Sequence, residues 1–311
     1  MVESRRDVLL LLDTPSLYFR AFYGVPETIT APDGTPVNAV RGLVDMVAFL
    51  LQKYRPTRLV ATMDADWRPA FRVAAVPSYK THRLAPQGGE QVPDTLSPQV
   101  PVIEQVLTAV GVPVVGVAGY EADDVIGTIA TAYQGPVDVV TGDRDLFQLV
   151  DAAKPVRVLY TAKGLRDIQV VDEAEVARRY GIPGRAYADF ALLRGDPSDG
   201  LPGVTGVGEK TAAGVVSRYG DAESLLAALD SGEADGLSPS VRAKLLAARD
   251  YLRAAVPVVR VARDVPVPAY DDRVPVTPRD PETLVALADR WNLDSPLSRL
   301  LAALEAVGVR H

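Results

Sequence analysis

Two groups of acidic residues stand close together in the middle of the chain. The first is the sequence Gly-Tyr-Glu-Ala-Asp-Asp at 119–124, and the second is Thr-Gly-Asp-Arg-Asp at 141–145. Valine-rich runs at 112–117 and 137–140 precede them, which predicts two buried strands with acidic ends, joined by a helix over 121–133. In a parallel βαβ unit we expect these ends to be neighbours, where open α/β sheets bind ligands. Crowded carboxylates repel unless hard cations neutralise them, so the pattern predicts a divalent-metal site.

Further acidic residues follow other predicted strands and turns. Asp13 ends the apolar run 8–12, Asp64 ends the run 58–63, and a Gly- and Pro-rich turn at 194–200 holds two more aspartates. One acidic pair at a helix N-terminus is explained by the helix dipole. Five such segments are a much stronger signal. The nine candidate metal ligands are Asp13, Asp64, Glu121, Asp123, Asp124, Asp143, Asp145, Asp196 and Asp199.

Composition excludes several other kinds of site. The 311 residues include no cysteine, which excludes disulfides, zinc-thiolate sites and cysteine nucleophiles. The two histidines, His82 and His311, make a histidine-based metal site or a Ser-His-Asp triad a poor fit. No apolar stretch approaches the roughly 20 residues that span a bilayer. The short apolar run after Arg5 and Arg6 is interpreted as a core strand and not as a signal peptide, so we expect a cytoplasmic protein.

The formal net charge of −7 does not exclude a nucleic-acid partner. Removing the nine candidate ligands from the 40 acids leaves 31, against 33 basic residues, which is a balance of +2. Two bound divalent ions would also reverse the local field. The distribution of charge is therefore more informative than its sum.

A basic segment lies between the Asp64 strand and a predicted helix over 97–110. Residues 67–89 include Arg68, Arg72, Lys80 and Arg83 and no acid. By itself this composition would indicate a solvated basic face. Beside an acidic metal centre it favours contact with a phosphodiester backbone.

The pattern of elements changes along the chain. Up to about residue 172, strands alternate with helices, including helices over 16–23 and 37–54 and a strand over 156–160. From about 173 the pattern is helical, with predicted helices over 173–180, 186–193, 210–219, 223–229 and 240–255. After 256 a Pro- and Val-rich stretch leads to a helix over 281–291 and a short one from 296, which we expect to pack on the core.

Residues 203–213, Gly-Val-Thr-Gly-Val-Gly-Glu-Lys-Thr-Ala-Ala, have the form of a helix-hairpin-helix. A Gly-x-Gly turn precedes a helix that begins near Lys210. Glycine allows positive φ and close backbone approach, which we expect at Gly208 in particular, so amide groups can hold phosphates near the helix N-terminus. The candidate DNA contacts here are Gly203, Gly206, Gly208, Lys210 and Thr211.

Together these motifs resemble the 5′-nuclease (flap endonuclease) family, in particular the bacterial 5′–3′ exonuclease found at the N-terminus of DNA polymerase I and as a free-standing protein. The resemblance covers about residues 7–255 and implies an α/β fold. It implies a twisted, mostly parallel central sheet flanked by helices, a helical arch, and an all-helical helix-hairpin-helix DNA-binding region. It divides the chain into a nuclease core over 1–172 with a basic arch at about 67–96, a DNA-binding region over 173–255, and a C-terminal extension over 256–311. A polymerase domain would need several hundred more residues, so we expect the free-standing form.

The resemblance also implies roles for single residues. Asp13, Asp64, Glu121, Asp123 and Asp124 would form a first site for Mg²⁺ or Mn²⁺, and Asp143, Asp145, Asp196 and Asp199 a second. Arg72, Lys80 and Arg83 would be the catalytic basic residues of the arch. Phe19, Arg20 and Tyr79 would contact DNA, with Phe19 stacking on a base, and carbonyls of the hairpin turn would bind K⁺. The implied enzyme is a monomer that cleaves DNA at a 5′ flap, nick, gap or free 5′ end and leaves 5′-phosphate and 3′-hydroxyl ends, in replication and repair.

The chain departs from the family pattern at a few positions. Thr14 stands where Gly is frequent, and His82 and Gly200 stand where Asn is common. Asp64 lies one residue further from Phe71 than usual, which leaves Asp66 as a rival ligand. None of these changes removes a carboxylate, so we expect an active enzyme.

Two other functions stay open. A PIN-like, Mg²⁺-dependent ribonuclease would share the acidic sheet and would lack the hairpin region and the basic arch. A catalytically weak DNA-junction binder would keep those two features and lose metal ligands. A phosphatase that forms an aspartyl phosphate needs a D-x-D sequence after the first strand, and Asp-Thr-Pro at 13–15 does not provide one.

Overall fold

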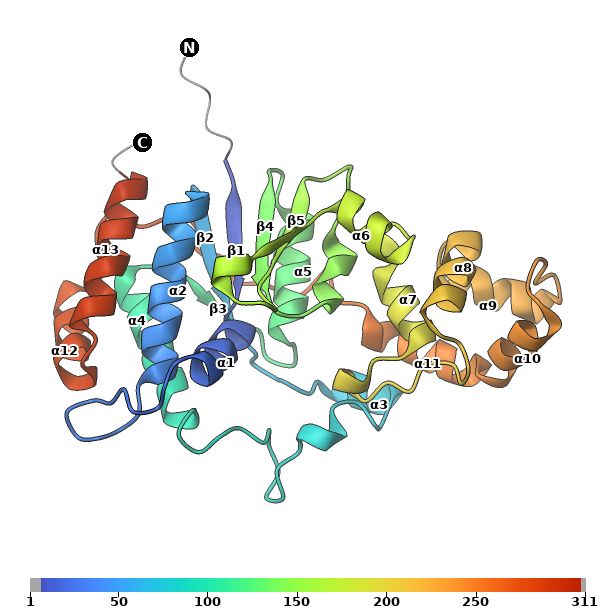
Figure 1. Cartoon of the computed structure of the whole chain (residues 1–311), viewed down its shortest axis with the longest axis horizontal. Helices are drawn as coiled ribbons and strands as arrows, with labels where there is room; N and C mark the ends of the chain where they lie inside the picture. The colour runs from blue at the N-terminus through green and yellow to red at the C-terminus, as the bar shows by residue number, and fades with distance from the viewer. Residues whose placement is uncertain (1–6, 309–311) are drawn as a thin grey trace, which may run out of the picture.

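A six-stranded sheet forms the centre of the computed structural model, which describes residues 7–308 (Figure 1). Arg5, Arg6 and His311 lie outside the described residues. The strand order is β3-β2-β1-β4-β5-β6, and every neighbouring pair is parallel except β5 and β6. This confirms the predicted mostly parallel sheet. The strands are β1 Leu9–Asp13, β2 Arg58–Thr62, β3 Val114–Val115, β4 Val137–Thr141, β5 Val156–Tyr160 and β6 Gln169–Val171.

Helices cover both faces of this sheet, which explains why β1 is leucine at four successive positions. Leu9 and Leu11 contact one apolar core, while Leu10 and Leu12 contact the other, because successive side chains of a strand point to opposite faces. The first core includes residues of α5, α7, α8 and α11, and the second includes residues of α2, α4, α12 and α13. Figure 1 shows α2, α4, α12 and α13 grouped beside the sheet, with α8, α9 and α10 at the opposite end of the molecule.

The helices largely follow the predicted pattern. Their bounds are α1 Thr14–Gly24, α2 Asn38–Tyr54, α3 Ala70–Ala75, α4 Val100–Val110, α5 Ala122–Ala132, α6 Glu173–Tyr180, α7 Tyr187–Arg194, α8 Glu209–Tyr219, α9 Ala222–Ser231, α10 Pro239–Ala247, α11 Arg249–Val259, α12 Pro281–Trp291 and α13 Asp294–Gly308. Within residues 7–308, no helix is both long and apolar enough to cross a membrane.

The prediction that the acidic strands β3 and β4 are neighbours was wrong. Strands β2 and β1 lie between them, although α5 is the crossover as expected. The chain places β2 and β3 on one side of β1, then returns across the sheet and adds β4, β5 and β6 on the other. The point where this order reverses lies beside β1, and such a switch point is where open α/β sheets bind ligands. Asp13 stands at the carboxyl end of this strand.

The structure differs from the sequence prediction at four places. The predicted helix 240–255 is divided at Ala248, whose backbone (φ −94°, ψ 6°) is not helical, into α10 and α11. The final helix is α13, 15 residues long and not short. Edge strand β6, three residues long, was missed because so short a run has no clear period. The basic segment is α-helical only over α3, with a 3₁₀ turn at Thr81–Arg83.

The chain after α11 returns along the sheet before its last two helices. Leu59 donates its backbone N–H to the Asp272 carbonyl (2.7 Å), and Val274 donates to Thr57 (3.1 Å). Helix α13 packs along α2, with Leu300 and Leu304 buried in the shared core.

One glycine sets how closely this returning segment approaches α5. A Cβ at Gly127 would lie 2.7 Å from the Ala262 carbonyl oxygen and 2.7 Å from Val261 Cγ2. We therefore predict that Gly127→Ala destabilises the fold by about 1–3 kcal/mol, the usual cost of overpacking a core. Equilibrium unfolding in urea measures this.

Gly214 in α8 is the matched control, because a Cβ there has no heavy atom within 4 Å. Gly214→Ala should be neutral or stabilising by up to about 1 kcal/mol, since alanine favours a helix over glycine. Equal stability of the Gly127→Ala variant and the parent would show that the segment moves away at no cost.

Candidate active site

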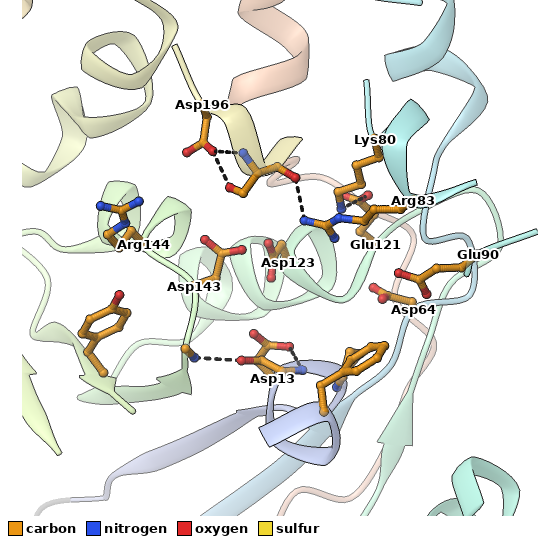
Figure 2. A pocket seen from close by; sticks show the side chains of 16 residues that line it. Asp13, Asp64, Lys80, Arg83, Glu90, Glu121, Asp123, Asp143, Arg144 and Asp196 are labelled. Carbon is orange, nitrogen blue, oxygen red and sulfur yellow. Dashed lines mark hydrogen bonds and ion pairs between the residues drawn. The ribbon is translucent and has the colours of Figure 1, made fainter. Parts of the chain in front are cut away.

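An open cleft of about 380 Å³ lies at the carboxyl ends of β1, β2 and β4. Carboxylates from six segments line it, and Figure 2 shows several of them pointing toward one another across the cleft. Six of the nine predicted ligands are among them. The carboxylates that line the cleft are Asp13, Asp64, Glu90, Glu121, Asp123, Asp143 and Asp196.

Asp13 occupies the central position because it is both the last residue of β1 and the N-cap of α1. Its Oδ1 accepts the Ser16 N–H (3.2 Å), and its Oδ2 accepts the Thr141 hydroxyl (2.5 Å). The second bond connects the ends of β1 and β4. Burial raises the pKa of Asp13 to about 7, and the nearby carboxylates of Asp64 and Asp143 also raise it.

The N-terminus of α5 brings the next carboxylates to the cleft. Asp64 Oδ1 accepts the backbone N–H of Ala122 (2.7 Å), so the end of β2 is joined to the first turn of α5. Asp123 lies in the same turn and faces Asp143 and Asp13 (Figure 2). Burial, followed by the charges of Asp13 and Asp143, raises the pKa of Asp123 well above its usual range.

The residues after β4 form the other wall. Asp143 Oδ1 accepts the backbone N–H of Asp145 (2.8 Å). Burial raises the pKa of Asp145, and so do the charges of Asp143, Asp199 and Asp196. Asp145 and Asp199 do not line the cleft itself. Each is hydrogen-bonded to a residue that does, since Asp145 donates its N–H to Asp143 and Asp199 donates its N–H to the Asp196 carbonyl (3.2 Å).

These carboxylates crowd together without converging on one point. Among residues 7–308, no three of them are placed to hold one ion directly. Mg²⁺ retains several of its waters in proteins and binds to one or two carboxylates. The set of oxygen donors, with raised pKa values caused by burial and mutual repulsion, therefore fits hard divalent ions held partly through water.

Asp124 and Arg72 are corrections to the predicted site. Arg72 is 2% exposed and holds both oxygens of Asp124, with nitrogen–oxygen distances of 2.6 and 2.7 Å. Asp124 also accepts the backbone N–H of Ala262 (2.8 Å). Neither side chain lines the cleft. Asp124 as a metal ligand and Arg72 as a residue at the phosphate were thus wrong, because the two form a buried ion pair beneath the site.

Tyr79 is a further correction. It was predicted to contact DNA, yet it is 1% exposed and its hydroxyl donates to the Glu121 carboxylate at 2.9 Å. The Glu121 carboxylate also accepts hydrogen bonds from Arg72 Nη1 (2.9 Å) and Lys80 Nζ (2.6 Å). Tyr79 thus supports Glu121 from below the cleft.

Lys80 and Arg83 do reach the cleft, as predicted for residues of the arch. Lys80 has left-handed backbone geometry (φ 48°), and its ammonium pairs with Glu121. Arg83 donates to the Ser198 carbonyl (2.8 Å) and pairs with Asp199 (3.3 Å). Lys80 is therefore paired with a carboxylate of the first predicted metal site, and Arg83 with a carboxylate of the second.

The base of the basic segment is fastened to the turn that carries Asp196 and Asp199. Lys80 donates its backbone N–H to the Asp199 carbonyl (2.9 Å), and the Ser78 hydroxyl donates to the Gly200 carbonyl (3.0 Å). Gly200 has φ +71°, and a Cβ there would lie 2.5 Å from the Ser78 carbonyl oxygen. Glycine at this position, where the family often has Asn, permits this close contact.

Sequence reasoning missed two charged residues of the cleft, Glu90 and Arg144. Glu90 lies beside Asp64 in Figure 2 because the turn after Leu84 folds back, with Gln91 donating to the Arg83 carbonyl (2.7 Å). No sequence signal marks it. Arg144 stands between Asp143 and Asp145, so the motif itself could have indicated it.

The aromatic and rival residues are placed as follows. Phe19 lines the cleft, whereas Arg20 lines an adjoining pocket, and its Nε is buried with no hydrogen-bond partner among the described residues. Asp66 accepts the backbone N–H of Arg68 (3.1 Å) and does not line the cleft. The geometry therefore favours Asp64 over Asp66 as the ligand.

The hairpin turn lies between α7 and α8. Gly203 (φ +65°) and Gly206 (φ +76°) have positive φ, and a Cβ at Gly203 would lie 2.4 Å from the Gly195 nitrogen. The expectation for Gly208 was wrong, since its φ is −93° and a Cβ there meets open space. It is instead the N-cap of α8, which carries Lys210 and Thr211 in its first turn.

The potassium site predicted at this turn does not fit the residues present. The Gly206 carbonyl accepts an exposed hydrogen bond from Lys244 Nζ at 2.9 Å. One of the turn carbonyls that were expected to bind K⁺ therefore already has a cationic partner from the chain itself.

Comparison with known proteins identifies the family. The family model described as "5'-3' exonuclease, N-terminal resolvase-like domain" matches residues 8–181, and the one described as "5'-3' exonuclease, C-terminal SAM fold" matches residues 182–282. The chain belongs to the 5′–3′ exonuclease family. It is therefore a nuclease, and the match over its helical region disagrees with the PIN-like alternative, which predicted no hairpin region.

Individual relatives agree with this assignment. The chain is 59% identical over 302 residues to the "5'-3' exonuclease" of Streptomyces coelicolor, covering 96% of this chain and 100% of the relative. It is 51% identical to that of Mycobacterium tuberculosis, covering 97% and 99%. It is 33% identical to the DNA polymerase I of Geobacillus stearothermophilus. This match covers 95% of this chain and 32% of the polymerase.

Solved structures share the fold of this exonuclease. The T5 D15 protein crystallised with metal ions has a TM-score of 0.66 at 15% identity, covering 96% of this chain and 99% of that one. The catalytic core of Rad2 in complex with a DNA substrate has a TM-score of 0.56 at 14% identity, covering 97% and 93%.

The buried position of Arg72 leads to a stability prediction. Arg72→Met should destabilise the exonuclease by about 3–5 kcal/mol, because Asp124 would then be buried without its partner. Arg178→Met is the matched control, since the Arg178 side chain is 70% exposed in its pair with Glu175 and a solvent-exposed ion pair contributes little to stability. Equilibrium denaturation of both variants decides whether Arg72 is a buried structural residue or a catalytic one. Wild-type stability with slow cleavage in Arg72→Met would restore a catalytic role for Arg72.

Proposed function

We propose that this exonuclease is a structure-specific 5′ nuclease that hydrolyses DNA phosphodiesters with two divalent metal ions, Mg²⁺ or Mn²⁺. The observation that carries the proposal is one cleft with two groups of carboxylates, each facing a cation of the basic arch. Among proteins that share the fold, one is a T5 D15 flap endonuclease in a pseudo-enzyme-product complex with DNA and metal ions, and one is a T5 5'-exonuclease with zinc.

The carboxylates divide into two candidate metal sites. Asp13, Asp64, Glu121 and Asp123 surround the ends of β1 and β2, while Asp143, Asp145, Asp196 and Asp199 surround the end of β4 and the 196–199 turn. These carboxylates would hold two divalent ions, which would supply an activated water and a polarised scissile phosphate. The expected products carry 5′-phosphate and 3′-hydroxyl ends.

Lys80 and Arg83 supply the positive charge that the carboxylates lack. Both are at the cleft surface, paired with Glu121 and Asp199, and each can exchange its carboxylate for a phosphate oxygen once metal ions share those carboxylates. A preorganised cation beside the developing charge lowers the barrier to cleavage. In this proposal Arg83, and not Arg72, acts with Lys80.

Binding of the DNA is assigned to surfaces on either side of the cleft. Phe19, which lines the cleft, stacks on a base, and Arg20, which lines the adjoining pocket, binds a phosphate. The amides at the start of α8, with Lys210 and Thr211, hold the duplex without reading its sequence.

The biological setting follows from this chemistry. We propose 5′ flaps, nicks, gaps and free 5′ ends as substrates, a monomeric enzyme, and a role in DNA replication and repair. The core with its arch performs cleavage, residues 173–255 bind DNA, and the C-terminal extension stabilises the core. The potassium ion expected at the hairpin turn is left out, because Lys244 already contacts Gly206.

The second metal site gives the first test. Asp143→Asn should abolish cleavage of a 5′-labelled flap in Mg²⁺ while duplex binding persists, since the carboxylate charge holds the ion and the hairpin holds the DNA. Asp250→Asn, at a side chain 94% exposed on α11, should cleave normally. Chelation of divalent ions should abolish cleavage by the wild type. Near wild-type turnover by Asp143→Asn would remove Asp143 from the site.

Lys80 gives the second test. Lys80→Ala should slow single-turnover cleavage by about 10²-fold or more, with a much smaller loss of affinity. Glu121 would remain paired with Arg72 and Tyr79, so the fold should persist. Lys53→Ala, an exposed lysine of α2, is the control. Equal losses of rate and affinity would make Lys80 a phosphate anchor only.

A further inference from the structure

The side chain of Lys244 lies across the hairpin turn. A Cβ built on Gly206 would meet Lys244 Nζ at 2.8 Å, Cε at 3.1 Å and Cδ at 3.6 Å, so the lysine covers this glycine along its length. Its ammonium donates to the Gly206 carbonyl at 2.9 Å. Within the described chain, no backbone amide donates to that oxygen. Lys244 therefore satisfies a carbonyl that the turn leaves open.

The packing of α10 holds the lysine in this place. Ser238 caps the helix by accepting the Val241 N–H (3.2 Å), and Leu245, the residue after Lys244, is fully buried. The side chain thus starts from a fixed point at the rim of the core. A free cation loses translational entropy when it binds from solution, whereas the ammonium group of Lys244 is already attached to the chain. A free cation would also have to displace this group.

The charges around the turn favour an anion beside it. Lys210 is exposed in the first turn of α8, and the carboxylate of Glu209 lies 3.6 Å from Arg194. The N-terminus of α8 contributes partial positive charge and free amides. With the Lys244 ammonium, the turn presents positive charge from this chain's own atoms.

We propose that Lys244 is a built-in replacement for a monovalent cation at the hairpin turn, so that this exonuclease binds duplex DNA without needing K⁺. The ammonium neutralises the Gly206 carbonyl dipole and supplies the charge that a bound K⁺ would bring to the phosphate. This inference rests on the proposed function, in which the hairpin holds the duplex. An ordinary phosphate anchor would differ from this role in one respect. Loss of an anchor would weaken binding equally in every salt, whereas loss of a replacement for K⁺ would make binding depend on which cation is present.

The test compares cations at one ionic strength. The dissociation constant of a fluorescent flapped duplex is measured by anisotropy, with divalent ions chelated, in KCl, NaCl or tetramethylammonium chloride. Tetramethylammonium is too large and has no N–H with which to occupy the turn. Wild type should bind equally, within twofold, in all three salts. Lys244→Met should bind several-fold more weakly in tetramethylammonium and should regain affinity in K⁺.

Two further variants separate the possible roles. Lys210→Met, which loses a phosphate contact only, should weaken binding by the same factor in all three salts. Lys244→Arg keeps a cationic donor and should retain the wild-type indifference to K⁺. Circular dichroism of each variant checks that the fold is intact.

Three different results would contradict the proposed role of Lys244. A wild type that binds at least threefold more tightly in K⁺ than in tetramethylammonium would overturn the inference, because a free cation then occupies the turn. A Lys244→Met variant weakened equally in all salts would make Lys244 a plain phosphate anchor. A wild type that binds no duplex in any salt would remove the proposed DNA-binding role of the hairpin, and the inference with it.

Discussion

The buried ion pair between Arg72 and Asp124 is the interaction on which the rest of the site depends. Its partners come from three distant parts of the chain: the base of the basic arch, the first turn of α5, and the end of α11 with the segment that follows it. In α11 the Val258 carbonyl accepts Arg72 Nε (3.2 Å), and after α11 the Ala262 N–H donates to Asp124 (2.8 Å). Two buried charges are tolerated only when each satisfies the other and the remaining hydrogen bonds are made. The pair therefore fixes where the arch leaves the core, and Glu121, beside it, is held at the edge of the cleft.

Above this pair, the site is governed by repulsion between carboxylates. Burial and mutual charge raise the pKa values of Asp13, Asp123 and Asp145, so the folded protein holds these groups together at an energetic cost. Thr141, Ser16 and Ala122 offset part of the cost by donating hydrogen bonds to Asp13 and Asp64. Lys80 and Arg83 offset another part. An arrangement of this kind gains most from divalent cations, which is why its geometry supports a metal-dependent nuclease.

The cations at the cleft and at the hairpin turn are both held by oxygen atoms of the chain, but by oxygens of different charge. At the cleft, Lys80 and Arg83 pair with the carboxylates of Glu121 and Asp199. In the proposed function, metal ions would bind these carboxylates and leave the two cations available to a phosphate. At the hairpin turn, Lys244 pairs with a neutral carbonyl and retains its full charge. The first arrangement suits chemistry that begins when metal and substrate are both present. The second suits a grip on the duplex that is always present.

Local sequence patterns determined most of the secondary structure and the family. Apolar runs predicted five of the six strands, since strands buried on both faces need continuous apolar residues, and acids at their ends predicted the cleft. Tertiary structure decided what each charged residue does. Arg72 and Asp124 carry the same motif signals as Lys80 and Asp123. Packing against the end of α11 and the segment after it buries the first two, while the second two line the cleft. Glu90 and Lys244 act across turns and helices that no local pattern connects. Motif spacing reports neighbours along the chain, whereas burial and charge pairing depend on segments that are 38 to 186 residues apart in these contacts.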